Sequence, residues 1–225
     1  MTKSQHQPIR VAIVGGSGKV ARQIIVQLRE RRDDAVAIFR NPDRFDEIAE
    51  LGAIPIALDI ESATVEQLAA VLAGSDAVVF SAGAGGGNPA RTRSVDFDGA
   101  VKTIAAASAA GVRRFVMVSA IHAGGPFPVE EDSPMFVYYQ AKHDADVAVQ
   151  ASELNWTILR PGTLTDDPAT GRFTLGDTVD NGEISRADVA AAVIAAIDDS
   201  RSVGHAWELT HGETPIAEAI AGAVN

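Results

Sequence analysis

The stretch VAIVGGSGKVARQIIVQL, residues 11–28, places a cluster of three glycines between an apolar segment and an amphipathic one. This pattern predicts a β-strand, a tight turn and an α-helix in that order. A helix that starts directly after a glycine turn presents free backbone N–H groups, and these attract phosphate together with the helix dipole. The stretch therefore predicts a phosphate-binding turn at the start of an α/β fold.

The spacing of the small residues distinguishes a triphosphate loop from a dinucleotide turn. A triphosphate loop requires Gly, four residues, then Gly-Lys followed by Ser or Thr, but Ile13 and Val20 stand at the first and last of these places. Gly15, Gly18 and Ala21 instead give G-x-x-G-x-x-A, the spacing of a dinucleotide turn. In such a turn the first glycine allows the sharp exit from the strand, the second lets a phosphate approach, and the small third residue lets helix and strand pack closely.

The neighbouring turn residues Ser17, Lys19 and Val20 are predicted to contact the same dinucleotide. A tight turn without a ligand is the alternative interpretation of the three glycines.

The rest of the chain alternates short apolar runs with longer helical patterns, which favours a doubly wound Rossmann-type α/β fold. The apolar runs are nearly continuous, so the strands are expected to form a parallel sheet with helices on both faces. Strands are predicted at residues 9–14, 35–39, 53–58, 76–80, 113–119, 155–160 and 205–210, and helices at 18–31, 42–51, 64–72, 90–110, 134–152, 186–198 and the C-terminal end. Residues 1–225 are expected to form one domain, with a flexible tail at 1–8 and a small C-terminal cap on the substrate side from 161–183 and 200–225.

Composition excludes several classes of protein. The chain has 225 residues and no cysteine, which excludes a disulfide scaffold. Its net charge of −11 argues against a nucleic-acid partner, because such partners need a cationic face. No apolar run approaches the roughly 20 residues that span a bilayer, and the start MTKSQHQPIR lacks the apolar core of a secretory signal. The protein is therefore expected to be cytoplasmic, without a membrane partner, and a monomer or homodimer.

The end of the second predicted strand suggests which dinucleotide binds. An acidic residue there would hydrogen-bond the ribose 2′-hydroxyl of NAD, but this chain has Arg40 in VAIFRNPDR, while Asp33 and Asp34 lie at the other end of the strand. A guanidinium suits the 2′-phosphate of NADP, and Arg44 and Lys19 can add positive charge. The sequence therefore favours NADP(H) over NAD(H), with a solvated loop arginine as the alternative.

One helical segment, FVYYQAKHDADVAVQ, carries residues suited to proton transfer. Tyr138 and Lys142 are four positions apart and share a helix face. A phenol beside an ammonium has a stabilised phenolate, so it can exchange a proton with a carbonyl or an alcohol. Tyr139 pairs at the same spacing with His143, a less useful partner. Ser119 ends the fifth predicted strand, at the carboxyl edge where open α/β sheets bind ligands. The histidines show no metal-binding spacing, and no metal site is predicted.

Eight segments together resemble the short-chain dehydrogenase/reductase superfamily: VGGSGKVA, FRNPDR, ALDIES, VVFSAG, VRRFVMVSA, YYQAK, TILRPGTLT and ISRADVAAAV. The chain is most similar to the atypical, extended-like NAD(P)H-binding branch, which includes small flavin and biliverdin reductases and sugar-epimerase-like proteins. The resemblance covers most of the chain. It does not specify a substrate, and the catalytic tyrosine is often lost in this branch.

The resemblance implies a role for each matching position. Ser119 would hydrogen-bond the substrate carbonyl, Tyr138 would donate the proton, and Lys142 would hold the nicotinamide ribose and tune Tyr138. The other positions implied to contact the cofactor are Asp59 and Ile60 at the adenine, Ser81, Ala82 and Gly83 under the dinucleotide, and Pro161, Gly162, Thr163 and Leu164 around the nicotinamide.

These observations predict an NADP(H)-dependent oxidoreductase that moves hydride between the nicotinamide and a small-molecule carbonyl, alcohol or flavin-like acceptor. Two other functions remain open at this point. One is a non-catalytic NADP(H)-binding redox sensor, and the other is a sugar epimerase or dehydratase.

Overall fold

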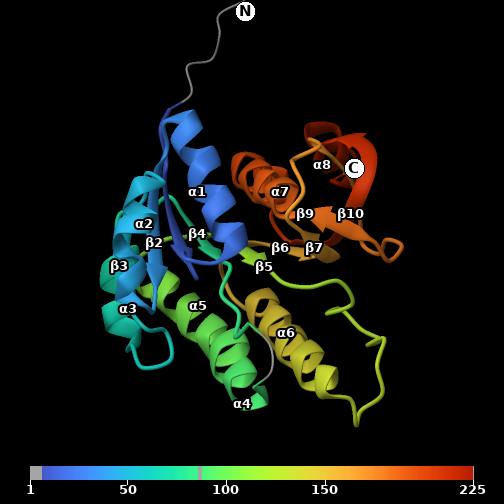
Figure 1. Ribbon diagram of the computed structural model, residues 1–225, viewed down its shortest axis with the longest axis horizontal. Helices are drawn as coiled ribbons and strands as arrows, with labels where there is room; N and C mark the ends of the chain where they lie inside the picture. Colours follow the sequence, from blue (N-terminus) through green and yellow to red (C-terminus); the bar gives the residue numbers. More distant parts are fainter. Residues whose placement is uncertain (1–6, 86–87, 225) are drawn as a thin grey trace, which may run out of the picture.

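A single sheet runs through the molecule, from the second and third strands at one edge to the C-terminal strands at the other (Figure 1). The computed structural model describes residues 7–85 and 88–224. The strand order is β3-β2-β1-β4-β5-β6-β10-β8. The strands of this sheet are β1 Arg10–Val14, β2 Asp34–Phe39, β3 Ile54–Ala57, β4 Ala77–Phe80, β5 Arg114–Val118, β6 Asn155–Pro161, β8 Arg172–Gly176 and β10 His205–Pro215. All neighbouring pairs are parallel except β10 and β8, so the predicted doubly wound parallel sheet is confirmed.

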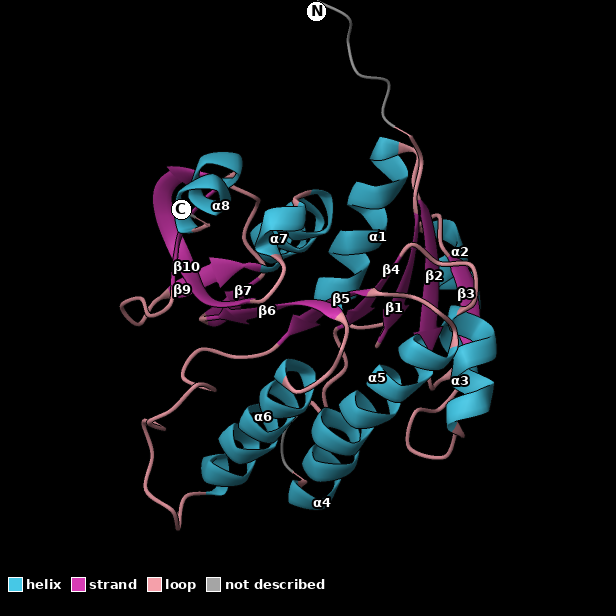
Figure 2. Ribbon diagram, turned by 180° about the vertical axis from the view of Figure 1, so that it is seen from behind, coloured by secondary structure: helices cyan, strands magenta, loops and turns pink. Residues whose placement is uncertain are grey.

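Helices cover both faces of this sheet, which lies as a middle layer between them (Figure 2). The helices are α1 Lys19–Arg31, α2 Phe45–Glu50, α3 Val65–Leu72, α4 Pro89–Thr92, α5 Gly99–Ala109, α6 Pro134–Gln150, α7 Arg186–Asp198 and α8 Ile216–Ala223, with short 3₁₀ turns η1 Pro42–Arg44 and η3 Ser200–Ser202. Buried residues of α1, α2, α7 and α8 pack on one face, and those of α3, α5 and α6 pack on the other.

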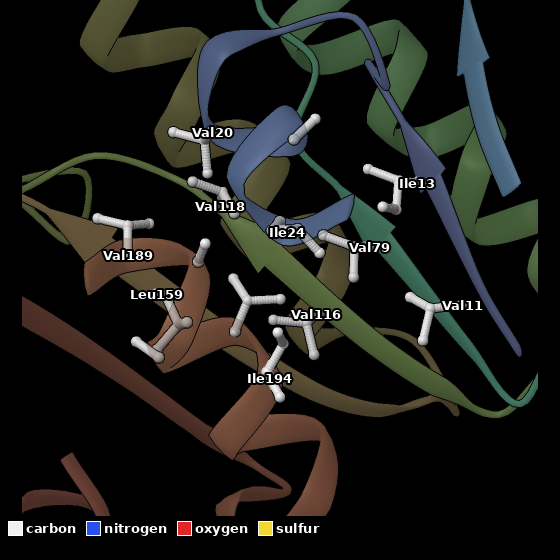
Figure 3. Packing of buried hydrophobic residues seen from close by; sticks show 14 of the residues in the cluster. Val11, Ile13, Val20, Ile24, Val79, Val116, Val118, Leu159, Val189 and Ile194 are labelled. Atoms are coloured by element: carbon white, nitrogen blue, oxygen red, sulfur yellow. The ribbon is translucent and has the colours of Figure 1, made fainter. Parts of the chain in front are cut away.

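Alternate residues of each central strand enter the two cores. Val11 and Ile13 of β1 pack with Ile24 of α1, whereas Ala12 and Val14 pack against the opposite helices. Figure 3 shows the first of these clusters, in which side chains of β1, β4, β5 and β6 meet those of α1 and α7. Because both sides of each strand are buried, the strands read as continuous apolar runs in the sequence.

The long helix expected at 90–110 is interrupted. The chain forms α4, then a π-helical turn η2 at Arg93–Asp98, then α5. A π turn inserts one extra residue per turn and shifts the side chains that follow. Here the shift accompanies an inward acidic side chain, Asp96, which is only 1% exposed. The helical segment expected at 90–110 is thus present from Pro89 to Ala109, with a π turn in its middle that was not predicted.

The C-terminal region extends the main sheet. β10 pairs with β6 in parallel, and β8 pairs with β10 in antiparallel orientation. β7 Thr163–Thr165 and β9 Glu183–Ser185 form a separate two-stranded parallel sheet. The segments expected as a cap thus supply two strands of the central sheet as well as loops at its edge. Most of the predicted tail at 1–8 lies outside the described residues.

The turn after β1 is shaped by its close approach to the end of β4. Gly15 has φ +86°, and its N–H and that of Gly16 both donate to Ile38 O. A Cβ added to Gly15 would lie 2.6 Å from the backbone of Ala82. The sharp exit expected at Gly15 and the close packing expected at Ala21, which is fully buried, are both present.

No helix in the described ranges 7–85 and 88–224 is long and apolar enough to cross a membrane.

Two glycines with similar backbone angles test how much the contact with β4 matters. Gly74 has φ +75° and open space around it, so Gly74→Ala adds only backbone strain of about 1–2 kcal/mol. Gly15→Ala adds the same strain and a backbone collision, so its cost should rise to about 2–5 kcal/mol. Urea unfolding measures the loss in the free energy of unfolding for each variant, provided that the m-value, the slope of that free energy against urea concentration, stays the same. Equal losses would show that the approach of Gly15 to Ala82 is not a constraint.

Candidate functional site

Two adjoining pockets lie at the carboxyl end of the sheet. The first, called here the tyrosine pocket, has a volume of about 580 Å³ and is lined by Ser119, Tyr138 and Lys142 among others. The second, the arginine pocket, has a volume of about 200 Å³ and is lined by Arg40 and Arg91 among others. The residues that line both pockets are Gly18, Ser81, Ala82 and Gly83. The two pockets therefore meet beneath the glycine turn.

The start of α1 faces this junction without a side-chain cap. Its N-cap residue is Gly18, which has no side chain to accept a hydrogen bond from the first turn. By contrast Thr64, Ser133 and Ser185 cap α3, α6 and α7 with their hydroxyls. The uncapped N–H groups of α1 fit a bound phosphate, which would satisfy them and complement the helix dipole.

The arginine pocket contains a network centred on Glu61. Arg91 donates to Glu61 Oε2 from Nε at 3.2 Å and from Nη2 at 3.1 Å, and Ser94 Oγ donates to Oε1 at 2.6 Å. The bond from Ser94, followed by the charge of Arg91, lowers the pKa of Glu61 despite its partial burial. Arg40 is more loosely held, with Nη1 3.5 Å from Glu61 and a half-exposed side chain. The lining of this pocket thus carries two arginines, Arg40 and Arg91, and two carboxylates, Asp59 and Glu61.

The neighbouring loop after β3 is fixed by Asp59. Its side chain accepts from the N–H of Glu61 at 3.0 Å, and its carbonyl accepts from the N–H groups of Ser62 and Ala63. Asp59 and Ile60 line the arginine pocket, where the adenine was expected.

Tyr138 and Lys142 lie on one face of α6, as their spacing predicts. The Lys142 ammonium lies 5.9 Å from the centre of the Tyr138 ring. It also makes a buried ion pair with Asp96 of the π turn, with Nζ 2.9 Å from Oδ1. The other Asp96 oxygen accepts from the N–H of Ala84 at 2.9 Å. One carboxylate thus joins the lysine to the loop that follows β4.

The charge state of Lys142 follows from this pairing. Burial by itself disfavours the ammonium and is the largest single influence, but the charge and hydrogen bond of Asp96, together with the charges of Tyr138 and Asp146, outweigh it and raise the pKa of Lys142 above its ordinary value. Lys142 therefore remains a cation at neutral and moderately alkaline pH.

Ser119 ends β5 with a buried hydroxyl. Its Oγ has no hydrogen-bond partner of ordinary geometry in the described part of the chain. Asp146 lies nearby on α6 and pairs with Arg160 at 2.8 Å. Burial raises the pKa of Asp146 even though Arg160 and the Ser119 hydroxyl oppose the shift. A buried hydroxyl at a pocket wall is suited to hydrogen-bond a ligand that enters.

Tyr139 belongs to a different environment. Its ring stacks on Phe127 with centroids 5.8 Å apart, and it is absent from the linings of both pockets. Burial, helped by the proximity of Tyr138, raises the pKa of Tyr139. His143 also contacts Phe127 and bonds the carbonyl of Ala123. This pair anchors the loop that precedes α6.

Most predicted site residues line one of the two pockets. The arginine pocket holds Gly15, Ser17, Gly18, Arg40, Asp59, Ile60, Ser81, Ala82 and Gly83, and the tyrosine pocket holds Lys19, Val20, Ser119, Tyr138, Lys142 and Leu164 in addition to the shared ones.

Four predicted cofactor contacts do not line either pocket. Arg44 pairs with Glu47 at 2.9 Å on the outer side of its turn. Pro161 is the last residue of β6, Gly162 follows it, and Thr163 begins β7. The N–H of Gly162 donates to Leu209 O and that of Thr163 to Gly182 O, so these groups have partners within the protein.

The sequence interpretation missed four charged lining residues: Glu61, Arg91, Asp96 and Arg186. Glu61 lies within the segment ALDIES, directly after Asp59 and Ile60, so its position was a usable signal. Asp96 depends on a π turn, which leaves no periodic pattern in the sequence. Within residues 7–85 and 88–224, no group of three or more His, Asp or Glu side chains is placed to hold a metal ion.

Comparisons with known proteins agree with this geometry. The model of an NAD(P)H-binding family matches residues 15–200. YhfK of Bacillus subtilis, named as an uncharacterized sugar epimerase, is 37% identical over 214 residues, covering 94% of this chain and 99% of its own.

Two solved structures are also similar. A Bacillus halodurans protein, described as an NAD-dependent epimerase/dehydratase, is 33% identical, with a TM-score of 0.85 and coverage of 95% of this chain and 99% of that one. The oxidoreductase ylbE of Lactococcus lactis is 28% identical, with a TM-score of 0.83 and coverage of 95% and 96%. The chain therefore has the Rossmann-type fold of these relatives and belongs to the NAD(P)H-binding family.

Proposed function

We propose that this protein is an NADP(H)-dependent oxidoreductase that transfers hydride between the nicotinamide and a small carbonyl, alcohol or flavin-like acceptor. The observation that carries the proposal is the convergence of Ser119, Tyr138 and Lys142 on one pocket that continues beneath the glycine turn toward Arg40. A screen for NADPH oxidation over quinones, flavins and aldehydes tests it.

The residues of the tyrosine pocket have complementary roles in this reaction. The bound nicotinamide supplies the hydride. Tyr138 donates a proton from Oη to the oxygen of the reduced carbonyl, and the nearby Lys142 ammonium stabilises the resulting phenolate. Ser119 hydrogen-bonds the same substrate oxygen and orients it. Asp96 keeps Lys142 charged and holds it in place.

The arginine pocket supports a preference for the 2′-phosphate. Arg40 has an exposed guanidinium and only a 3.5 Å contact with Glu61, so it can turn toward a ligand at little cost. Glu61 is already neutralised by the two contacts from Arg91. The carboxylate therefore repels a phosphate less than an unpaired one would.

A sugar epimerase is a second candidate, supported by the name of the 37% identical relative from Bacillus subtilis. The two reactions differ in stoichiometry. An oxidoreductase consumes one NADPH for each product molecule, whereas an epimerase returns the hydride and shows no net oxidation. Product analysis beside the absorbance assay separates them, and cofactor binding without either reaction would favour a redox sensor.

Cofactor preference gives the first prediction. Calorimetric titration should show tighter binding of NADPH than of NADH. Arg40→Ala should weaken NADPH binding by about 10- to 150-fold, because one charge-assisted contact to phosphate contributes about 1.5–3 kcal/mol, and should leave NADH binding nearly unchanged.

Arg44→Ala is the matched control, because Arg44 lies in the same loop but pairs with Glu47. Equal affinities for the two cofactors in the unmodified protein would contradict the preference.

The glycine turn gives the second prediction. Gly18→Asp should abolish dinucleotide binding while the protein stays folded. The backbone at Gly18, with φ −69° and ψ 157°, is the ordinary N-cap conformation, so an aspartate can cap α1 there. Its carboxylate would then occupy the pyrophosphate position and repel the cofactor.

Gly18→Asn is the neutral control of the same shape and should bind more tightly than the aspartate variant. Circular dichroism checks the fold and calorimetry the affinity. Normal binding by a folded Gly18→Asp protein would place the pyrophosphate elsewhere.

The adjacent tyrosines give the third prediction. Tyr138→Phe should reduce turnover about 10²- to 10⁴-fold through the loss of general-acid catalysis and should leave cofactor affinity nearly unchanged. Tyr139→Phe should have little effect on turnover, because that side chain packs on Phe127 outside the pocket. Steady-state kinetics with an acceptor from the screen measures both. Full turnover by Tyr138→Phe would exclude this tyrosine as the proton donor.

A further inference from the structure

Two cations and one carboxylate meet at the mouth of the tyrosine pocket. Lys19 is the first residue of α1, and Arg186 is the first residue of α7. Asp166 follows β7 and bridges them, with Oδ2 2.6 Å from Lys19 Nζ and Oδ1 2.7 Å from Arg186 Nη1. A segment from beyond the sixth strand is thereby tied to the glycine turn.

The two cations face the pocket, whereas the carboxylate does not line it. Lys19 and Arg186 are both lining residues of the tyrosine pocket, together with Gly18 and Leu164. Asp166 is absent from that lining, and its side chain is 61% exposed. The cations can therefore be reached from the pocket while their present partner contacts them from the solvent side.

The charges in the pocket lining do not balance without an added anion. The charged lining residues are Lys19, Asp96, Lys142 and Arg186. Asp96 and Lys142 neutralise each other in their buried pair. Two positive charges remain, and the single charge of Asp166 compensates only one of them. The uncapped N-terminus of α1 adds further positive potential at the same place.

We propose that Lys19 and Arg186 form a binding site for an anionic group, a phosphate or a carboxylate, and that Asp166 occupies this site until a ligand displaces it. The inference rests on the proposed function, because the group belongs to a ligand of the tyrosine pocket. The bound anionic group is either the pyrophosphate of the cofactor or an anionic group of the substrate.

Displacement of Asp166 requires little free energy. Exposed ion pairs contribute modestly to stability, since water and salt screen them. A phosphate carries more charge than a carboxylate and accepts several hydrogen bonds, so it can replace both contacts of Asp166. An arginine with a mostly buried stem, such as Arg186 at 21% exposure, is already positioned for such a contact.

Removal of the internal carboxylate is the decisive test. If Asp166 competes with the ligand, Asp166→Asn should tighten anion binding by roughly 3- to 10-fold. If the carboxylate only ties the segment down, the same variant should leave binding unchanged or weaken it.

Asp167→Asn is the matched control, because it removes the same charge from the next residue, which makes no ion pair with a described residue. If the two variants changed anion affinity equally, the effect would come only from the change in net charge, and the proposal would be overturned.

Arg186→Met should act in the opposite direction and weaken anion binding about tenfold or more. Arg186→Lys should restore part of the affinity, and Lys19→Met provides a second variant if Arg186→Met does not fold. Thermal unfolding checks that each variant is native.

Two titrations identify the source of the anion without requiring turnover. NADPH is titrated into the free protein, and inorganic phosphate is titrated into the protein saturated with NADP⁺. If the variants change only the affinity for NADPH, the site binds the cofactor pyrophosphate. If they change only the affinity for phosphate, the site binds an anionic group of the substrate. Failure of both titrations to respond to the Asp166 and Arg186 variants overturns the proposal.

A protein that binds no nicotinamide cofactor would refute the proposed function separately. In that event, inorganic phosphate titrated into the free protein still tests the anion site. If Asp166→Asn then tightens phosphate binding and Arg186→Met weakens it, the proposed anion site still stands. If neither variant changes phosphate binding, the anion site is refuted as well.

Discussion

The contact between Gly15 and the end of β4 determines how the rest of the site is built. A side chain at Gly15 would collide with the backbone of Ala82, so only glycine fits at the point where the chain passes over the end of β4. This passage places the start of α1 directly above the carboxyl end of the sheet. Because Gly18 then begins the helix without a side-chain cap, the N–H groups of its first turn face the junction of the two pockets. One steric constraint in the core thus creates an electrostatic feature at the surface.

Each cation at the pockets is paired with a carboxylate of the protein. Lys142 is paired with Asp96, Arg91 with Glu61, and Lys19 and Arg186 share Asp166. The pairs differ in burial, and this difference decides what each can do. The Asp96–Lys142 pair is almost inaccessible, so breaking it would leave an uncompensated buried charge. The pairs of Asp166 are exposed and can exchange partners at low cost. The pocket therefore combines a fixed charge beside Tyr138 with exchangeable charges at its mouth.

Local patterns in the sequence predicted the sheet and the glycine turn, since continuous apolar runs and the spacing of Gly15, Gly18 and Ala21 record local requirements. The interactions that could not be predicted join residues far apart in the chain. Asp96 reaches Lys142 through a π turn that breaks helical periodicity, and Asp166 lies 147 positions from Lys19. Arg44 was expected to add positive charge for a phosphate, but it pairs with Glu47, three positions later, and lines neither pocket. Sequence spacing located the candidate residues, but pairing between distant carboxylates and cations decided which of them face the pocket.

The buried pair also separates the roles of the two residues on α6. Desolvation alone would push the Lys142 ammonium toward its neutral form, but Asp96, with smaller contributions from Tyr138 and Asp146, reverses this effect and raises the pKa of Lys142. The lysine consequently stays charged at neutral and moderately alkaline pH, and it supplies a constant positive charge beside Tyr138. In the proposed mechanism the two side chains of the tyrosine pocket therefore divide the work, with proton transfer by the Tyr138 phenol and electrostatic support from the Lys142 ammonium.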